Sequence, residues 1–161
     1  VRWAARQTLE GRFFDPGNPE RGRWLRSDVN EFLTETWDQV DQLVVRARLS
    51  ELLTFGSRHN VFLAAITTAA YEALLGRGVS CSYAASLVGD VGWKIYEWMV
   101  RLASDQFRLT SRDPQKRLER TLRALMVFPF SAPGAPAYEV SAWAESGRFF
   151  THWTHCPPQS D

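Results

Sequence analysis

The stretch HNVFLAAITTAAYEALLGRG, residues 59–78, decides the fold class because it is apolar on nearly every face of a helix. A helix with this pattern lies at the centre of a domain, where other elements cover its sides. The GRG sequence at 76–78 is typical of a helix C-terminus, where glycine is the favoured capping residue. We therefore predict a buried central helix over about residues 59–75. Glu72, its one carboxylate, either lines a pocket with Thr68 or reaches solvent.

Amphipathic helices are predicted before and after this central helix. Asp28 and Glu31 form a capping-box-like pair at the start of a helix that reaches about residue 44. Further along, Asp113 followed by Pro114 predicts another helix start, because proline is favoured at the first helical position. The apolar residues of this later helix recur at helical spacing and form its inner face: Leu118, Leu122, Leu125 and Met126.

A further helix is predicted from Ser80 or Ser82 to about residue 103. Its apolar side chains predict one buried stripe: Ala84, Leu87, Val88, Val91, Ile95, Trp98, Met99 and Leu102. Gly89 and Gly92 each weaken this helix by about 1 kcal/mol relative to alanine. We therefore expect close backbone packing, or space for a ligand, around these two glycines.

The C-terminal part has a different periodicity. AYEVSAWA (137–144) and RFFTHWTH (148–155) both alternate around an ESG turn, and this pattern predicts a β-hairpin. Helices followed by strands indicate the α+β class: a mostly helical N-terminal body of about four helices, then a C-terminal antiparallel β-hairpin or small sheet. We assign residues 27–161 to a single α+β domain.

The first 26 residues are rich in arginine and are punctuated by DPGNP and RGR, so we predict an irregular arm over residues 1–26. Phe13, Phe14 and Trp24 either pin this arm to the body or dock it on a partner chain as a homo-oligomer contact. The chain begins with Val1 rather than Met, and we expect it to be part of a longer protein, truncated at its C-terminus.

Composition excludes several classes of function. A chain of 161 residues with 45% hydrophobic residues has enough material for a folded core, and a net charge of +1 supports neither nucleic-acid binding nor a membrane surface. No apolar run reaches the roughly 18–20 residues of a membrane span, and no signal peptide opens the chain. G-x-G-x-x-G, Walker, H-E-x-x-H and G-x-S-x-G motifs do not occur in the sequence. Two cysteines do not make a disulfide framework, so we expect a reduced, cytoplasmic protein.

The C-terminal stretch FFTHWTHCPPQSD, residues 149–161, carries the most distinctive chemistry. In a strand, His152 and Cys156 share a face but lie about 13 Å apart at 3.3 Å per residue, whereas His155 adjoins Cys156 and points to the other face. Neither imidazole therefore pairs with the thiol. Pro157 ends the strand, so Cys156 is either a reactive thiol presented at a strand end or a small buried residue.

Two other readings of the cysteines and histidines remain open. H-x-x-H-C at 152–156 contains metal-ligand types, with Cys81 and His59 as the only further candidates, although zinc sites normally show a second cluster. Cys81 lies near a predicted helix N-terminus, where the helix dipole can lower the pKa of a thiol. The alternative is that Cys81 has only a structural role or is simply exposed.

The combination of AAYEALLGRGVS, LVGDVGWKIYEWM, a charged helix and a strand that leads into THCP (154–157) resembles the L-2-amino-thiazoline-4-carboxylic acid hydrolase-like family. The resemblance covers roughly residues 59–158. Members of that family continue after the Cys-Pro step with further strands and a Cys-Asp-Phe type ending. These do not occur in this sequence, so a site that needs them is incomplete in it.

The resemblance implies a hydrolase that opens a small cyclic, amidine-containing carboxylic acid to an S-carbamoyl-cysteine-type product. Cys156 is the one residue that maps onto a family position, as nucleophile or active-site ligand. We take His152, His155, Arg148 and Glu72 as candidate substrate-binding residues. Arg148 either binds the substrate carboxylate or is a solvated turn residue. No cofactor and no metal are assigned. The alternative is a non-enzymatic domain that binds a metal, a cofactor or a partner through the same strand.

Overall fold

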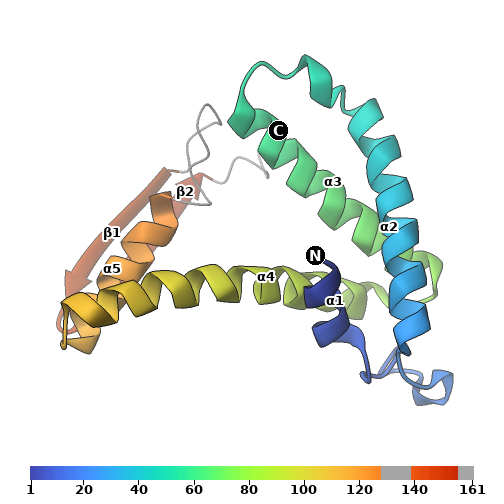
Figure 1. Ribbon diagram of the computed structural model, residues 1–161, viewed down its shortest axis with the longest axis horizontal. Helices are drawn as coiled ribbons and strands as arrows, with labels where there is room; N and C mark the ends of the chain where they lie inside the picture. The colour runs from blue at the N-terminus through green and yellow to red at the C-terminus, as the bar shows by residue number, and fades with distance from the viewer. Residues whose placement is uncertain (128–138, 156–161) are drawn as a thin grey trace. The chain divides into compact units, whose positions relative to one another are not determined.

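The computed structural model describes residues 1–127 and 139–155. In this part of the chain it contains five α-helices and two strands: α1 (Arg2–Leu9), α2 (Arg26–Arg46), α3 (Phe55–Gly76), α4 (Cys81–Thr110), α5 (Pro114–Val127), β1 (Glu139–Glu145) and β2 (Arg148–His155). Figure 1 shows these helices and, after them, the antiparallel hairpin. The prediction of a mostly helical α+β protein is confirmed, with one helix more than the expected four.

The chain divides into two compact units. Unit 1 contains Val1–Leu49 and Phe62–Tyr96, and unit 2 contains Ser50–Val61 and Glu97–Asp161. Both α3 and α4 contribute residues to each unit. The core of unit 1 is formed by α1, α2 and the parts of α3 and α4 that belong to it, together with Trp24 and Val79.

The predicted irregular arm over residues 1–26 is wrong at its beginning, because residues 2–9 form α1. Ala4, Ala5 and Leu9 are fully buried, so the helix is stabilised by packing on unit 1. An eight-residue segment with two arginines offers too short an apolar pattern to be recognised from sequence. Trp24 is only 1% exposed and stacks on Phe14 at 4.3 Å between ring centroids. Of the two expected roles, Trp24 therefore has that of pinning the segment to its own unit.

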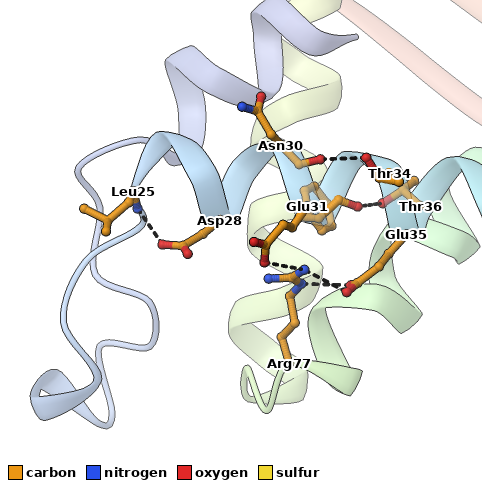
Figure 2. Close-up of polar contacts among 9 residues, drawn as sticks. Leu25, Asp28, Asn30, Glu31, Thr34, Glu35, Thr36 and Arg77 are labelled. Carbon is orange, nitrogen blue, oxygen red and sulfur yellow. Dashed lines mark hydrogen bonds and ion pairs between the residues drawn. The ribbon is translucent and has the colours of Figure 1, made fainter.

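The helix α2 starts three residues earlier than predicted, because its N-cap is Leu25. Asp28 is its third helical residue rather than its cap, and its carboxylate accepts a hydrogen bond from the backbone N–H of Leu25 at 2.8 Å. Two turns further on, Glu35 forms two hydrogen bonds with the guanidinium of Arg77, at 2.8 and 2.9 Å. Figure 2 shows Arg77 reaching from the segment after α3 to Glu35 and to Glu31. These contacts fix α2 against the turn between α3 and α4.

The expected complete burial of α3 is also wrong, because only one side of this helix is covered. Ala65, Ala69, Ala73 and Leu74 are buried, whereas Ala64, Thr67, Thr68 and Glu72 are exposed. Apolar residues all around the helix made every side look equally suited to the core. Burial was decided instead by which side meets α2 and α4, through small alanines that permit close packing.

The predicted buried stripe of α4 is confirmed at its start and wrong at its end. Leu87 is fully buried in unit 1, but Trp98 is 62% exposed and Leu102 51% exposed. The helix has 30 residues, about 45 Å at 1.5 Å per residue, and only its first part belongs to unit 1. Helical spacing predicts which residues share a side, but it does not predict how far the neighbouring elements extend along it.

Unit 2 contains α5 and the hairpin. Pro114 begins α5 and the carboxylate of Asp113 accepts from the backbone N–H of Gln115 at 2.9 Å, as the Asp-Pro pair predicted. The hairpin turns at Ser146 and Gly147, both with positive φ, which is the backbone of a tight two-residue turn. The side chain of Gln115 donates to the carbonyl of Gly147 at 3.1 Å, so the start of α5 is attached to the hairpin turn.

Candidate functional site

An open depression of about 610 Å³ lies on unit 1, between the DPGN loop and the beginning of α4. Its polar lining consists of one carboxylate, one amide and four hydroxyl-bearing side chains: Asp15, Asn18, Ser80, Ser82, Tyr83 and Ser86. All of them belong to unit 1. The depression therefore offers several hydrogen-bonding side chains at one place on unit 1.

The carboxylate of Asp15 is buried and already has partners. It accepts from the backbone N–H of Gly17 at 2.9 Å, which closes a turn within the loop, and from the N–H of Ser80 at 3.0 Å. These contacts, first the one from Gly17, hold the pKa of Asp15 below its ordinary value although burial acts in the opposite direction. A carboxylate with a lowered pKa is a weak base, so this site is better suited to binding than to proton transfer.

Arg21 lies in the same loop and binds the other side of the turn between α3 and α4. Its guanidinium donates to the carbonyl of Gly78 at 2.6 Å and to that of Arg77 at 2.5 Å. The loop thus supplies an anion before the first residue of α4 and a cation after the last residue of α3. Both charges have the sign that stabilises the respective helix end.

Cys81 is the first residue of α4 and is exposed. The hydroxyl of Tyr71 donates a hydrogen bond to its sulfur, and this bond is the first reason why the pKa of Tyr71 is raised. Burial of the phenol acts in the same direction. A phenol whose pKa is raised stays protonated at neutral pH and acts there as a hydrogen-bond donor.

The candidate residues at the C-terminus are placed only in part. Arg148 is the first residue of β2, pairs with Glu145 and is exposed; His152 pairs with Ser141 and is also exposed. His155 is the last residue of β2, and its side chain lies outside what the structure describes. Cys156 lies outside the described residues altogether.

Glu72 is exposed on α3 and belongs to unit 1, whereas Arg148 and His152 belong to unit 2. Of the two expected positions for this carboxylate, the structure has the solvent-exposed one. Gly89 and Gly92, which we expected to mark close packing or a ligand, have no atoms within 4 Å of the position a Cβ would occupy. Close packing is therefore not the reason for glycine at these positions.

Within residues 1–127 and 139–155, no three His, Cys, Asp or Glu side chains gather closely enough to hold an ion. The H-x-x-H-C candidate includes Cys156, which lies outside the described residues, so the metal reading of that stretch stays a prediction. His59 instead stacks on Phe55 at 6.0 Å. Over the same residues, no helix combines the length and apolar character required to cross a membrane.

The sequence did not lead us to predict the depression on unit 1, although one of the two backbone contacts of Asp15 has a local sequence signature. Asp-Pro-Gly is a typical turn sequence in which the aspartate side chain accepts from a backbone N–H two residues later. The contact with Ser80 spans 65 residues and has no local signature. Comparison with known proteins finds no family model, curated protein or solved structure that matches this chain.

Proposed function

We propose that the chain is part of a cysteine-dependent hydrolase that opens a small cyclic amidine-containing carboxylic acid, with Cys156 as the nucleophile. The observation that supports this proposal is the course of β2, which continues from Arg148 to His155, the residue before Cys156. The sequence then continues with Pro157 and Pro158, which lack the N–H that a strand ladder needs. The end of a strand is a position at which folds often present functional side chains.

The attachment of the hairpin to α5 supports this role. Gln115 holds the hairpin turn, and the guanidinium carbon of Arg123 lies 5.5 Å from the ring centroid of Phe149. A nucleophile is effective when a rigid element presents it, because positioning removes much of the entropic cost of the reaction. The hairpin supported by α5 is such an element.

The proposed reaction is a hydrolysis in two steps. The thiolate attacks the amidine carbon of the ring, the ring C–N bond breaks, and the released nitrogen takes up a proton. Water then attacks the same carbon, and the bond from this carbon to the Cys156 sulfur breaks. One water molecule is consumed, and the Cys156 thiolate is regenerated. A reducing cytoplasm would keep this thiol available.

Strand geometry changes which residues can bind the substrate. Arg148 and His155 are seven residues apart at opposite ends of β2, roughly 23 Å at 3.3 Å per residue. A single small substrate beside His155 therefore cannot reach Arg148. His152 lies about 10 Å from His155 on the same scale. The proposal keeps the two histidines near the substrate and assigns its carboxylate to a cation other than Arg148.

The test compares the two cysteines of the chain. We expect Cys156→Ala to abolish ring opening of 2-aminothiazoline-4-carboxylate, whereas Cys81→Ala, which removes the exposed thiol of unit 1, retains it. Alkylation of the Cys81→Ala protein, followed against pH, reports the Cys156 thiol alone and should show a pKa below that of a free cysteine. An ordinary thiol pKa together with unchanged turnover of Cys156→Ala would refute the proposal.

The second candidate is a non-enzymatic binding domain. Its support is the exposed His152 on the same strand as the exposed ring of Phe150. If this candidate is right, the protein purified with Cys156→Ala still binds its ligand, and His152→Ala/His155→Ala does not. Metal analysis of the purified protein, with and without the two histidines, tests the metal version directly.

A further inference from the structure

The two faces of the hairpin differ in what covers them. Phe149, which contacts Arg123 of α5, pairs with Ala144, and the neighbouring pair on that face is Ala142 with Thr151. This inner face lies against α5, beside which the hairpin runs in Figure 1. Among the residues whose side chains the structure describes, the opposite, outer face carries three cross-strand pairs: Ser141 with His152, Trp143 with Phe150, and Glu145 with Arg148.

The outer face presents an aromatic pair to solvent. The rings of Trp143 and Phe150 stack with centroids 5.4 Å apart, yet Trp143 is 44% exposed and Phe150 36% exposed. The other four residues of this face are exposed as well. A two-stranded sheet is marginally stable in water unless its faces are covered, and in the described part of unit 2 the ring that α5 contacts is Phe149, on the inner face. The outer face therefore has the character of a surface that packs against something.

We propose that this outer face binds the same face of a second copy of the chain, through a twofold axis that runs parallel to the strands. Such an axis places β1 of one copy over β2 of the other. Glu145 then lies opposite Arg148 of the second copy, and Trp143 lies opposite Phe150 of the second copy. Sheets that pack face to face in this way lie about 10 Å apart with interdigitating side chains.

Charge complementarity selects this occupant and this axis. In each cross-strand pair the two residues differ, and the twofold axis places each residue of β1 opposite the β2 member of the same pair in the second copy. An acid therefore meets a base, and an aromatic ring meets an aromatic ring. A twofold axis perpendicular to the strands would place Glu145 and Arg148 over the Ser141–His152 end of the other copy and leave the charges unmatched. The three described pairs carry one acid, Glu145, and one arginine, Arg148, so their charges balance and do not favour a strongly charged partner.

The size of the face predicts how strong the association is. Six side chains are far fewer than the 20–30 residues per partner of a standard interface. We therefore expect a weak dimer, which forms at micromolar to millimolar concentrations of the chain. This inference does not rest on the proposed hydrolase, and because His152 belongs to the outer face, a substrate beside His152 and a second copy would compete for this surface.

Complementary charge reversals test the proposal. The variant Glu145→Arg puts two cations on this end of the face, and Arg148→Glu puts two anions there. By sedimentation equilibrium of the full chain, each variant alone should associate about tenfold more weakly than the wild type, because like charges meet across the axis. An equimolar mixture of the two should associate at least as strongly as the wild type. A folding defect within one chain cannot be repaired by mixing, so recovery reports contact between copies.

The control variants make the same charge changes elsewhere. Lys116→Glu on α5 and Glu10→Arg after α1 alter net charge at exposed positions away from the outer face and should leave the association unchanged. Wild-type protein that remains monomeric at about 1 mM would overturn the proposal. So would single variants that associate like the wild type, or a mixture that associates no better than either variant alone.

Discussion

Asp15 and Arg21 bind the two sides of one turn between helices. The carboxylate of Asp15 accepts from the N–H of Ser80 at 3.0 Å, directly before α4, and the guanidinium of Arg21 donates to the carbonyl of Gly78 at 2.6 Å, after α3. The same loop also inserts Phe14, over whose ring the Arg21 guanidinium carbon lies at 4.5 Å. A segment that resembles a linker in sequence therefore holds two long helices together at their shared end.

The charge on Asp15 should make unit 1 sensitive to acid. Because its hydrogen bonds hold the pKa of Asp15 below the ordinary value of 3.8, this carboxylate stabilises the fold above about pH 3.8 and the stabilisation disappears as the pH falls further. Asp15→Asn should lower the melting temperature by several degrees at pH 7 and flatten its decline below pH 4. Asp41→Asn, at an exposed position of α2, is the control and should change neither. Equal pH profiles of all three proteins would contradict this expectation.

The stripe of α4 should be energetically important only where unit 1 covers it. Leu87→Ala removes a fully buried side chain from the core and should cost about 2–5 kcal/mol of unfolding free energy. Leu109→Ala removes a side chain of the same size that is 89% exposed, and should change the free energy by less than about 0.5 kcal/mol. Urea titrations followed by circular dichroism measure both. Similar losses for the two variants would mean that something covers the far part of α4.

Signals within a few residues of one another were enough to predict much of this fold. Asp113 with Pro114 predicted the start of α5, and the ESG turn predicted the hairpin, whose strands run over Glu139–Glu145 and Arg148–His155. Both are local, because turn and cap conformations are set by the residues that adopt them. The helix α1 was missed for the opposite reason, since its stability comes from packing rather than from its own eight residues.

Contacts between distant residues were not predictable in the same way. Arg21 is 57 residues from Gly78 in sequence, and many arginines in the first 26 positions were equally plausible partners. Trp98 and Leu102 were expected in the core because helical spacing carries no record of where unit 1 ends. The candidate site shows the same difference between local and distant signals. The strand that leads to Cys156 was predicted and is present up to His155, whereas the partners of that thiol remain a prediction.

The side chains of Arg77 and Glu35, which are joined by two hydrogen bonds, should show a coupling free energy in a double-mutant cycle. The Arg77 side chain is only 16% exposed and binds both carboxylate oxygens, so the interaction is less screened than an ordinary surface pair. Arg77→Ala, Glu35→Ala and the double variant should give a coupling free energy of about 1 kcal/mol. The same cycle with Glu31, whose oxygen is 3.7 Å from the Arg77 guanidinium, is the control and should give less. A larger coupling with Glu31 would reverse this assignment.

Replacing Gly147 and Gly89 by alanine should change the stability of the protein in opposite directions. Gly147 has φ of +75° in the hairpin turn, and an added Cβ would lie 2.9 Å from the Nε2 of Gln115. Gly147→Ala should therefore destabilise the hairpin by about 1 kcal/mol or more and accelerate hydrogen exchange of the amides in β1 and β2.

Gly89 is helical, and a Cβ there would meet no atom within 4 Å. Gly89→Ala should stabilise α4 by about 1 kcal/mol, because the only effect left is helix propensity. Loss of stability in Gly89→Ala would mean that a partner or ligand approaches α4 at this glycine, as its position in the sequence first suggested.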